Sequence, residues 1–186
     1  MDAAATAVAD TEDAWYQRLR LQWRPERVKL LLVGESAPDA GAGTGTAGTV
    51  QRRFFYAPTV NRADNLFRGV VLALYGEKVS AGDDRAPLLR RLLNDGVWLV
   101  DLVPFPVNHL SPSARNRALL KHAPARTQQI LDIAPDGIII CHAPTFRALA
   151  PALVEAGAPL LHREPVPFPL GNFRAQFAAA VREAIA

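Results

Sequence analysis

Residues 28–38, VKLLLVGESAP, decide the fold class of this chain. After Lys29 the stretch is a run of leucine and valine with no polar alternation, and it ends at Gly34 before a short polar turn. Such a run is typical of a strand buried on both faces of a parallel sheet. Ligands of open α/β sheets bind where strands of this kind end. The turn carries Glu35 and Ser36, so it is either part of a functional site or an ordinary strand-to-helix turn.

Further segments of the chain read as strands that alternate with helices. Apolar runs predict strands at 97–102, 137–141 and 158–162, in addition to the first strand at 28–34. Apolar spacing, capping residues and glycines predict helices over residues 12–22, 62–75, 84–95, 112–133, 143–156 and 172–185, with Pro124 kinking or dividing the long one. Strands that alternate with helices imply a parallel sheet with helices on both faces. We therefore expect an α/β fold.

The length and composition favour a single domain. The 186 residues, of which 49% are hydrophobic, suffice for one well-buried α/β domain over 1–186 and are few for two. Residues 1–11 read as a flexible tail. Residues 39–50, DAGAGTGTAGTV, read as a loop over a ligand or as a tolerated insertion.

Cysteine usage and hydropathy exclude several classes of protein. The single Cys141 excludes a disulfide framework, a four-cysteine zinc site and a four-cysteine iron–sulfur cluster. No apolar run approaches a membrane span, and the first residues lack the order of a secretory signal. We expect a cytoplasmic monomer with no membrane partner, no metal and no cofactor.

The net charge of +3 is modest, but arginines recur where loops are expected. Arginine binds phosphate with a planar fork and is more weakly hydrated than lysine. The pattern therefore fits either a polyanionic partner or a solvated surface. These arginines are Arg52, Arg53, Arg62, Arg68, Arg90, Arg91, Arg115, Arg117, Arg126 and Arg174.

Three segments together resemble the uracil-DNA glycosylase superfamily, and its small mismatch-specific members in particular. The segments are VGESAP at 33–38, RRFFYAPTVNRADNLF at 52–67 and GVWLVDLVPFPVNHLS at 96–111, and the similarity in order and spacing spans about residues 28–180. The resemblance implies a three-layer αβα sandwich with a four-stranded parallel sheet in the order 2-1-3-4. It also implies a protein that binds duplex DNA, and by extension single-stranded DNA, and that flips a nucleotide into a pocket at the strand ends.

The resemblance assigns roles in the first two segments. Glu35 and Ser36 lie in the loop that orients the attacking water in the family, and the adjacent Gly34 belongs to the base-binding pocket. Phe55 and Tyr56 occupy the region that stacks on the base, with Tyr56 the better match because it directly precedes an alanine. The alternative for both aromatic residues is packing in the core.

Asp101 stands where the family commonly has an asparagine that reads the base edge. An asparagine offers a donor and an acceptor, whereas an ionised aspartate only accepts. The edge of uracil needs an acceptor for N3–H and a donor for O4, so Asp101 favours a base edge that is rich in donors. The alternative is a carboxylate that caps the loop after the strand.

The last motif of the family matches Phe168, Leu170, Gly171 and Asn172 in the stretch FPLGN. Phe168 takes the place of a histidine, and losing one such donor costs on the order of 3 kcal/mol of barrier. Leu170 and Phe173 would fill the space left by a flipped base, or pack in the core. His142 and His162 lie near this motif in sequence but out of register with it, and His142 would reach the site or cap the next helix.

The resulting hypothesis is a DNA-repair glycosylase-like protein that binds a flipped, damaged or deaminated base with weak or no uracil excision. The DNA contacts would come from Arg52, Arg53, Leu170, Gly171, Asn172 and Arg174. The alternatives are a non-catalytic homologue that binds DNA or a nucleotide, and an unrelated α/β metabolic enzyme. A basic rim that includes Arg115 as well would favour the DNA-binding hypotheses over the metabolic one.

Overall fold

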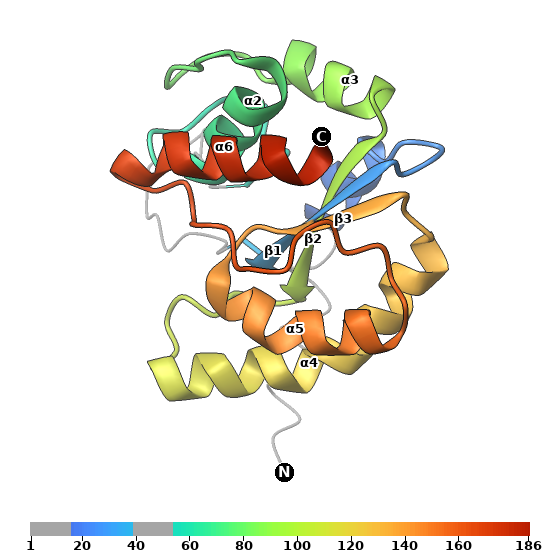
Figure 1. The fold of residues 1–186 in the computed structure, drawn as a ribbon. Helices are drawn as coiled ribbons and strands as arrows, with labels where there is room; N and C mark the ends of the chain where they lie inside the picture. The colour runs from blue at the N-terminus through green and yellow to red at the C-terminus, as the bar shows by residue number, and fades with distance from the viewer. Residues whose placement is uncertain (1–15, 39–53) are drawn as a thin grey trace.

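A computed structural model, which describes residues 16–38 and 54–186, has a parallel sheet between two layers of helices (Figure 1). The strands β1 (Leu30–Ser36), β2 (Val97–Val103) and β3 (Gly137–Ile140) form the order β2-β1-β3. One side of the sheet carries α2 (Asn65–Tyr75), α3 (Ala86–Asn94) and α6 (Arg174–Ile185), and the other carries α4 (Pro112–Ile133) and α5 (Ala143–Glu155). Residues 16–22 are helical as well. The expected α/β class is confirmed.

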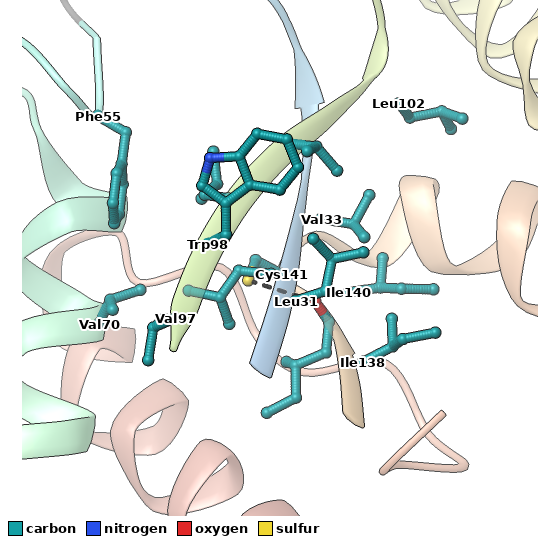
Figure 2. Packing of buried hydrophobic residues seen from close by; sticks show 14 of the residues in the cluster. Leu31, Val33, Phe55, Val70, Val97, Trp98, Leu102, Ile138, Ile140 and Cys141 are labelled. Carbon is teal, nitrogen blue, oxygen red and sulfur yellow. Dashed lines mark hydrogen bonds between the residues drawn. The ribbon is translucent and has the colours of Figure 1, made fainter. Parts of the chain in front are cut away.

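The strands are apolar without alternation because helices cover both faces of the sheet. Every residue of β2 is buried, as are the first five residues of β1. Leu31 in the central strand lies beside Trp98 on one neighbour and Ile138 on the other. Figure 2 shows these three side chains in one buried cluster.

The fourth strand expected at 158–162 does not form. Leu160 makes a single isolated parallel bridge to Ile138, and the sheet of the described residues has three strands. The amide of Ile140 then donates to Nε2 of His162 at 2.9 Å instead of to a backbone carbonyl. Pro159 lies within this short segment and Pro165 follows it, and a proline cannot donate to a strand ladder. A side chain therefore completes the edge of β3 in place of a full strand.

The helices agree with the sequence pattern in number and differ mainly at their ends. α4 continues through Pro124 without a break, and its expected cap is present because Ser111 accepts the amide of Ala114 at 3.4 Å. The last helix is preceded by a single 3-10 turn, η1 (Gly171–Phe173). Within the part of the chain that the structure describes, no helix is both long and apolar enough to cross a membrane.

Candidate functional site

A pocket of about 170 Å³ opens where β1 and β2 end, on the side of the sheet that carries α2. We call it the edge pocket. Its polar lining comes from Ser36, Asp64, Asn65 and Asp101, and four phenylalanine rings line it, those of Phe54, Phe55, Phe67 and Phe168. The carboxyl edge of a parallel sheet thus gathers segments that are far apart in sequence.

The aromatic wall is held in place from behind. Phe55 packs edge-to-face on Tyr56 and on Phe67, with ring centroids 5.1 and 5.2 Å apart. Tyr56 itself is buried and does not line the pocket: its hydroxyl donates to the Leu99 carbonyl at 3.1 Å and accepts the Leu99 amide at 2.7 Å. Burial raises the pKa of the Tyr56 hydroxyl above its ordinary value. Of the two rings expected to stack on a ligand, the structure places Phe55 on the pocket surface and Tyr56 in the core.

Asp101 lies at the back of the edge pocket and is 6% exposed. Its Oδ2 accepts a hydrogen bond from Nη2 of the buried Arg20, and it does not cap the loop that follows β2. Burial raises the pKa of Asp101 to about 6, against the opposing effect of Arg20. Oδ1 lies over Gly34, where an added Cβ would stand only 2.6 Å from it. A glycine at position 34 therefore makes room for the carboxylate.

A second acidic side chain in the pocket was not expected from the sequence. Asp64 accepts hydrogen bonds from Arg85 and from the Asn61 amide, and burial raises its pKa. Arg85 is fully buried and also donates to the carbonyls of Phe54 and Phe55, at 2.5 and 2.8 Å. One guanidinium thus joins the acidic and the aromatic walls of the pocket. No local sequence pattern marks Arg85, because its partners lie more than twenty residues away.

Glu35 does not face the edge pocket. It borders a separate cavity of about 340 Å³ between α4 and α5, where both of its oxygens accept hydrogen bonds from Arg115, the one from Nε at 2.5 Å. Successive side chains of a strand point to opposite faces, so Glu35 and Ser36 open on different cavities. The two residues expected to orient one water are therefore separated by the sheet.

His142 contacts one lining residue of each cavity, Glu35 and Phe168. Its Nδ1 lies 3.7 Å from Oε1 of Glu35 and 3.1 Å from Oγ1 of Thr145, and its ring packs edge-to-face on Phe168 at 5.8 Å. Burial lowers the pKa of His142, with Glu35 opposing this effect. His142 therefore borders the Glu35 cavity and contacts the edge pocket through Phe168; it occupies the N-cap position of α5, without a capping hydrogen bond from its side chain, and His162 belongs to the edge of β3.

The segment after Phe168 forms an exposed apolar rim. Phe168, Leu170 and Phe173 are 37%, 60% and 53% exposed, so none of them is a core contact. Asn172 is exposed too, and Gly171 adopts a φ of 54°, in the left-handed region that favours glycine.

The arginines expected on a basic rim are only partly placed beside the pocket. Arg174 donates to Oδ1 of the lining residue Asn65 at 3.0 Å, and Arg115 is bound to Glu35 on the other side of the sheet. Arg52 and Arg53 lie outside the described residues.

Within residues 16–38 and 54–186, no three His, Cys, Asp or Glu side chains are grouped so that they could hold a metal ion. The chain matches no known protein family, no curated protein and no solved structure.

Proposed function

We propose that this protein is DNA-repair glycosylase-like: it binds DNA and holds one flipped base in the edge pocket, with weak or no excision of uracil. The observation that carries this proposal is the meeting of Phe55, Asp101 and Phe168 on one pocket at the carboxyl edge of a parallel sheet. Phe55 and Asp101 come from the second and third segments of the resemblance, and Phe168 comes from the stretch matched to the last motif of the family. The proposed pocket needs no metal or cofactor to bind a base.

The size and lining of the pocket suit one flat ring system. Its cavity of about 170 Å³ is smaller than the roughly 300–1,000 Å³ of pockets that hold drug-sized ligands. Phenylalanine faces stack on any nucleobase, and such stacking contributes about 1–3 kcal/mol per base. The rings of Phe54, Phe55 and Phe168 are the candidates for this contact.

The polar groups of the pocket favour a base edge that is rich in N–H donors. The Oδ1 atom of Asp101 has no hydrogen-bond partner among the described residues, and Asp64 supplies a second carboxylate. A ring N–H beside an exocyclic amino group would satisfy Asp101. Uracil would instead place its O4 against an acceptor, and leaving that oxygen unpaired costs about 1–3 kcal/mol.

Excision would require water to attack the anomeric carbon of the sugar while the base leaves with the electrons of the glycosidic bond. Ser36 lines the pocket and would orient such a water, but Glu35 is held by Arg115 away from the pocket. Phe168 offers no donor to the departing base. This position of Glu35 also favours the second candidate function, a non-catalytic homologue that binds DNA or a nucleotide.

The exposed rim supports a DNA partner. Leu170 and Phe173 are exposed, follow the pocket residue Phe168 closely in the chain, and could fill the space that a flipped base leaves in the duplex. Asn172 and Arg174 lie in the same segment, and Arg52 and Arg53 directly precede the pocket residue Phe54 in the sequence. Substituting Arg52 and Arg53 by alanine should weaken binding to every DNA sequence and reduce its salt dependence, because contacts to phosphate release counterions.

Binding to mismatched duplexes tests the base pocket directly. Fluorescence anisotropy would compare duplexes that carry mismatched guanine, 2,6-diaminopurine, hypoxanthine, xanthine, thymine or uracil at one position. We expect guanine, which has N1–H beside its 2-amino group, to bind at least about tenfold more tightly than uracil and than diaminopurine, whose N1 is an acceptor, with Asp101→Asn removing this preference. Equal affinity for all bases in both proteins would contradict the proposal.

Excision is tested with the same duplexes by strand cleavage after alkali treatment. The unmodified protein lacks a donor to O4 at position 101 and a donor to the leaving base at position 168. These losses raise the barrier by about 1–3 and about 3 kcal/mol, so uracil excision should be roughly three to four powers of ten slower than in a protein that has both donors. Asp101→Asn and Phe168→His, alone and combined, should restore part of the rate on a U·G duplex. Robust uracil excision by the unmodified protein, or no gain in the double variant, would place the chemistry elsewhere.

A further inference from the structure

A third cavity, of about 380 Å³, lies on the outer side of β2, between the helical residues 16–22 and the second half of α4. Three arginines line it, Arg20, Arg24 and Arg126, together with Trp98. We call this cavity the arginine groove. We propose that the arginine groove binds a phosphate group, as a site separate from the edge pocket.

The positive charges of the three arginines are not balanced by carboxylates in the lining of the groove. Arg20 already holds Asp101, which lies outside the lining, and the carboxylate in the lining, Asp132, accepts a hydrogen bond from Gln128 at 3.0 Å. Arg126 forms no ion pair or hydrogen bond with any of the residues that the structure describes. Three guanidinium groups therefore share a groove in which the acidic groups are partly engaged elsewhere.

Arg126 carries the inference because it is half-buried without a partner. Its Nε is buried and makes no hydrogen bond, and the same holds for Nε of Arg20. Burial lowers the pKa of Arg126 and the neighbouring Arg20 lowers it further, whereas the charge of Asp101, which forms no hydrogen bond with Arg126, raises it. Desolvating a cation without pairing it costs free energy, which a bound anion would recover.

The arrangement of the three forks favours phosphate over a simple carboxylate. Arg20 belongs to the helical residues 16–22, Arg24 follows them and Arg126 comes from α4, so the donors converge from different elements. Arg24 stacks over the ring of Trp98 at 5.1 Å, which restricts its orientation. A tetrahedral oxyanion offers acceptors in several directions and pairs with more than one planar guanidinium fork. The phosphate could come from the DNA backbone or from a free nucleotide.

Calorimetric titration of the full chain with inorganic phosphate and with pyrophosphate, at constant ionic strength, tests the site. Arg126→Gln should weaken pyrophosphate binding at least about tenfold, equivalent to about 1.4 kcal/mol. Arg117→Gln is the matched control, because Arg117 lies exposed on the same helix, and its affinity should stay within about twofold of the wild type. Absence of saturable binding, or an equal loss in both variants, would overturn the proposal.

A second pair of titrations separates the two sources of phosphate. If Arg126→Gln weakens binding of an undamaged duplex tenfold and leaves a nucleoside monophosphate unaffected, the ligand is the DNA backbone; the converse identifies a free nucleotide. Unchanged affinity for both ligands contradicts the site. Thermal unfolding in phosphate-free buffer checks that Arg126→Gln is folded: it should melt close to the wild type, because it removes a desolvated cation that has no hydrogen-bonded partner among the described residues but also a favourable charge near Asp101. If Arg126→Gln is unfolded, Arg126→Lys serves as the second variant. It keeps the positive charge, lacks the planar guanidinium fork, and should bind pyrophosphate several-fold more weakly than the wild type.

Discussion

Glu35 and Asp101 lie at the same edge of the sheet, on neighbouring strands, and each is held by an arginine, yet their surroundings differ. Asp101 and its partner Arg20 are both buried, with side chains 9% and 7% exposed. Glu35 is paired with Arg115 beside an open cavity, and the side chains of Glu35 and Arg115 are 13% and 36% exposed. The two carboxylates are thus about equally buried, and the difference lies in their arginines. We expect the burial of the arginine to decide how much each pair contributes to stability.

The two carboxylates also influence each other. Glu35 raises the pKa of Asp101 in addition to the larger effect of burial, so two negative charges share the end of β1 and β2. The two carboxylates lie on opposite faces of the sheet: Asp101, bound to Arg20, lines the edge pocket, and Glu35 is bound to Arg115 toward α4 and α5. The protein thereby keeps one acceptor for a ligand in the edge pocket and neutralises the other.

The largest expected effect comes from breaking the buried pair. Arg20→Met leaves the Asp101 carboxylate buried without a cation, and such a loss costs about 3–5 kcal/mol in the free energy of unfolding at neutral pH. Urea denaturation would measure it, with Arg18→Met as the matched control because Arg18 is exposed on the same helical turn. Adding Asp101→Leu to Arg20→Met should recover most of the loss. A loss below about 1 kcal/mol would mean that Asp101 is solvated.

The second-largest effect should be on the pH dependence of stability, because Asp101 is buried and Glu35 has a partly exposed partner. Its pKa is raised from 3.8 to about 6, so the folded state binds the proton more tightly than the unfolded state. Stability of the wild type relative to Asp101→Asn should therefore fall as the pH rises from about 4 to about 6, and level off above that range. At 1.36 kcal/mol for each pKa unit, the relative change is up to about 3 kcal/mol. Urea denaturation between pH 4 and pH 8 measures it, and a change of opposite sign would contradict the buried environment.

Gly34→Ala tests how tightly the carboxylate is placed. The added Cβ would stand 2.6 Å from Oδ1 of Asp101, a short side chain that Arg20 holds in place, so one of them must shift. Forcing extra volume into a packed site costs about 1–3 kcal/mol. The same substitution in an Asp101→Ala background should cost far less, which a double-mutant cycle would measure. Equal costs in both backgrounds would show that the clash is with the backbone instead.

The sequence predicted the sheet where burial alone determines the structure. The runs at 30–34 and 97–103 are apolar because both of their faces are covered, and this signal is local. The run at 158–162 looks similar, but it makes a single bridge to β3. Pro159 within it cannot donate a hydrogen bond, and the side chain of His162 accepts the amide of Ile140 in place of a backbone carbonyl. Whether a short apolar run joins a sheet depends on its neighbours in space, which the sequence does not display.

The candidate site was predictable in its position and not in its electrostatic partners. Gly34, Phe55, Asp101 and Phe168 do lie together, because parallel strands end at one edge. The opposite directions of Glu35 and Ser36 follow from strand alternation, a signal that was present in the sequence. The partners Arg20 and Arg115 lie about eighty residues from the carboxylates they bind, so no local pattern could assign them.

The smallest effect on stability should come from the ion pair of Glu35 and Arg115, in which the arginine is partly exposed. Arg115→Gln removes a cation from Glu35, but solvent reaches this pair and screens it, so the loss of stability should stay below about 1 kcal/mol. The structural consequence should be larger than the energetic one: without Arg115, Glu35 remains 3.7 Å from Nδ1 of His142, which becomes its nearest basic partner. The pKa of His142 should then rise, because Arg115, one of the two cations that lower it, is gone, while Arg147 remains and Glu35 still raises it. Titration of the His142 ring by NMR would show this shift. A stability loss as large as that of Arg20→Met would mean that the exposure of the arginine does not distinguish the two pairs.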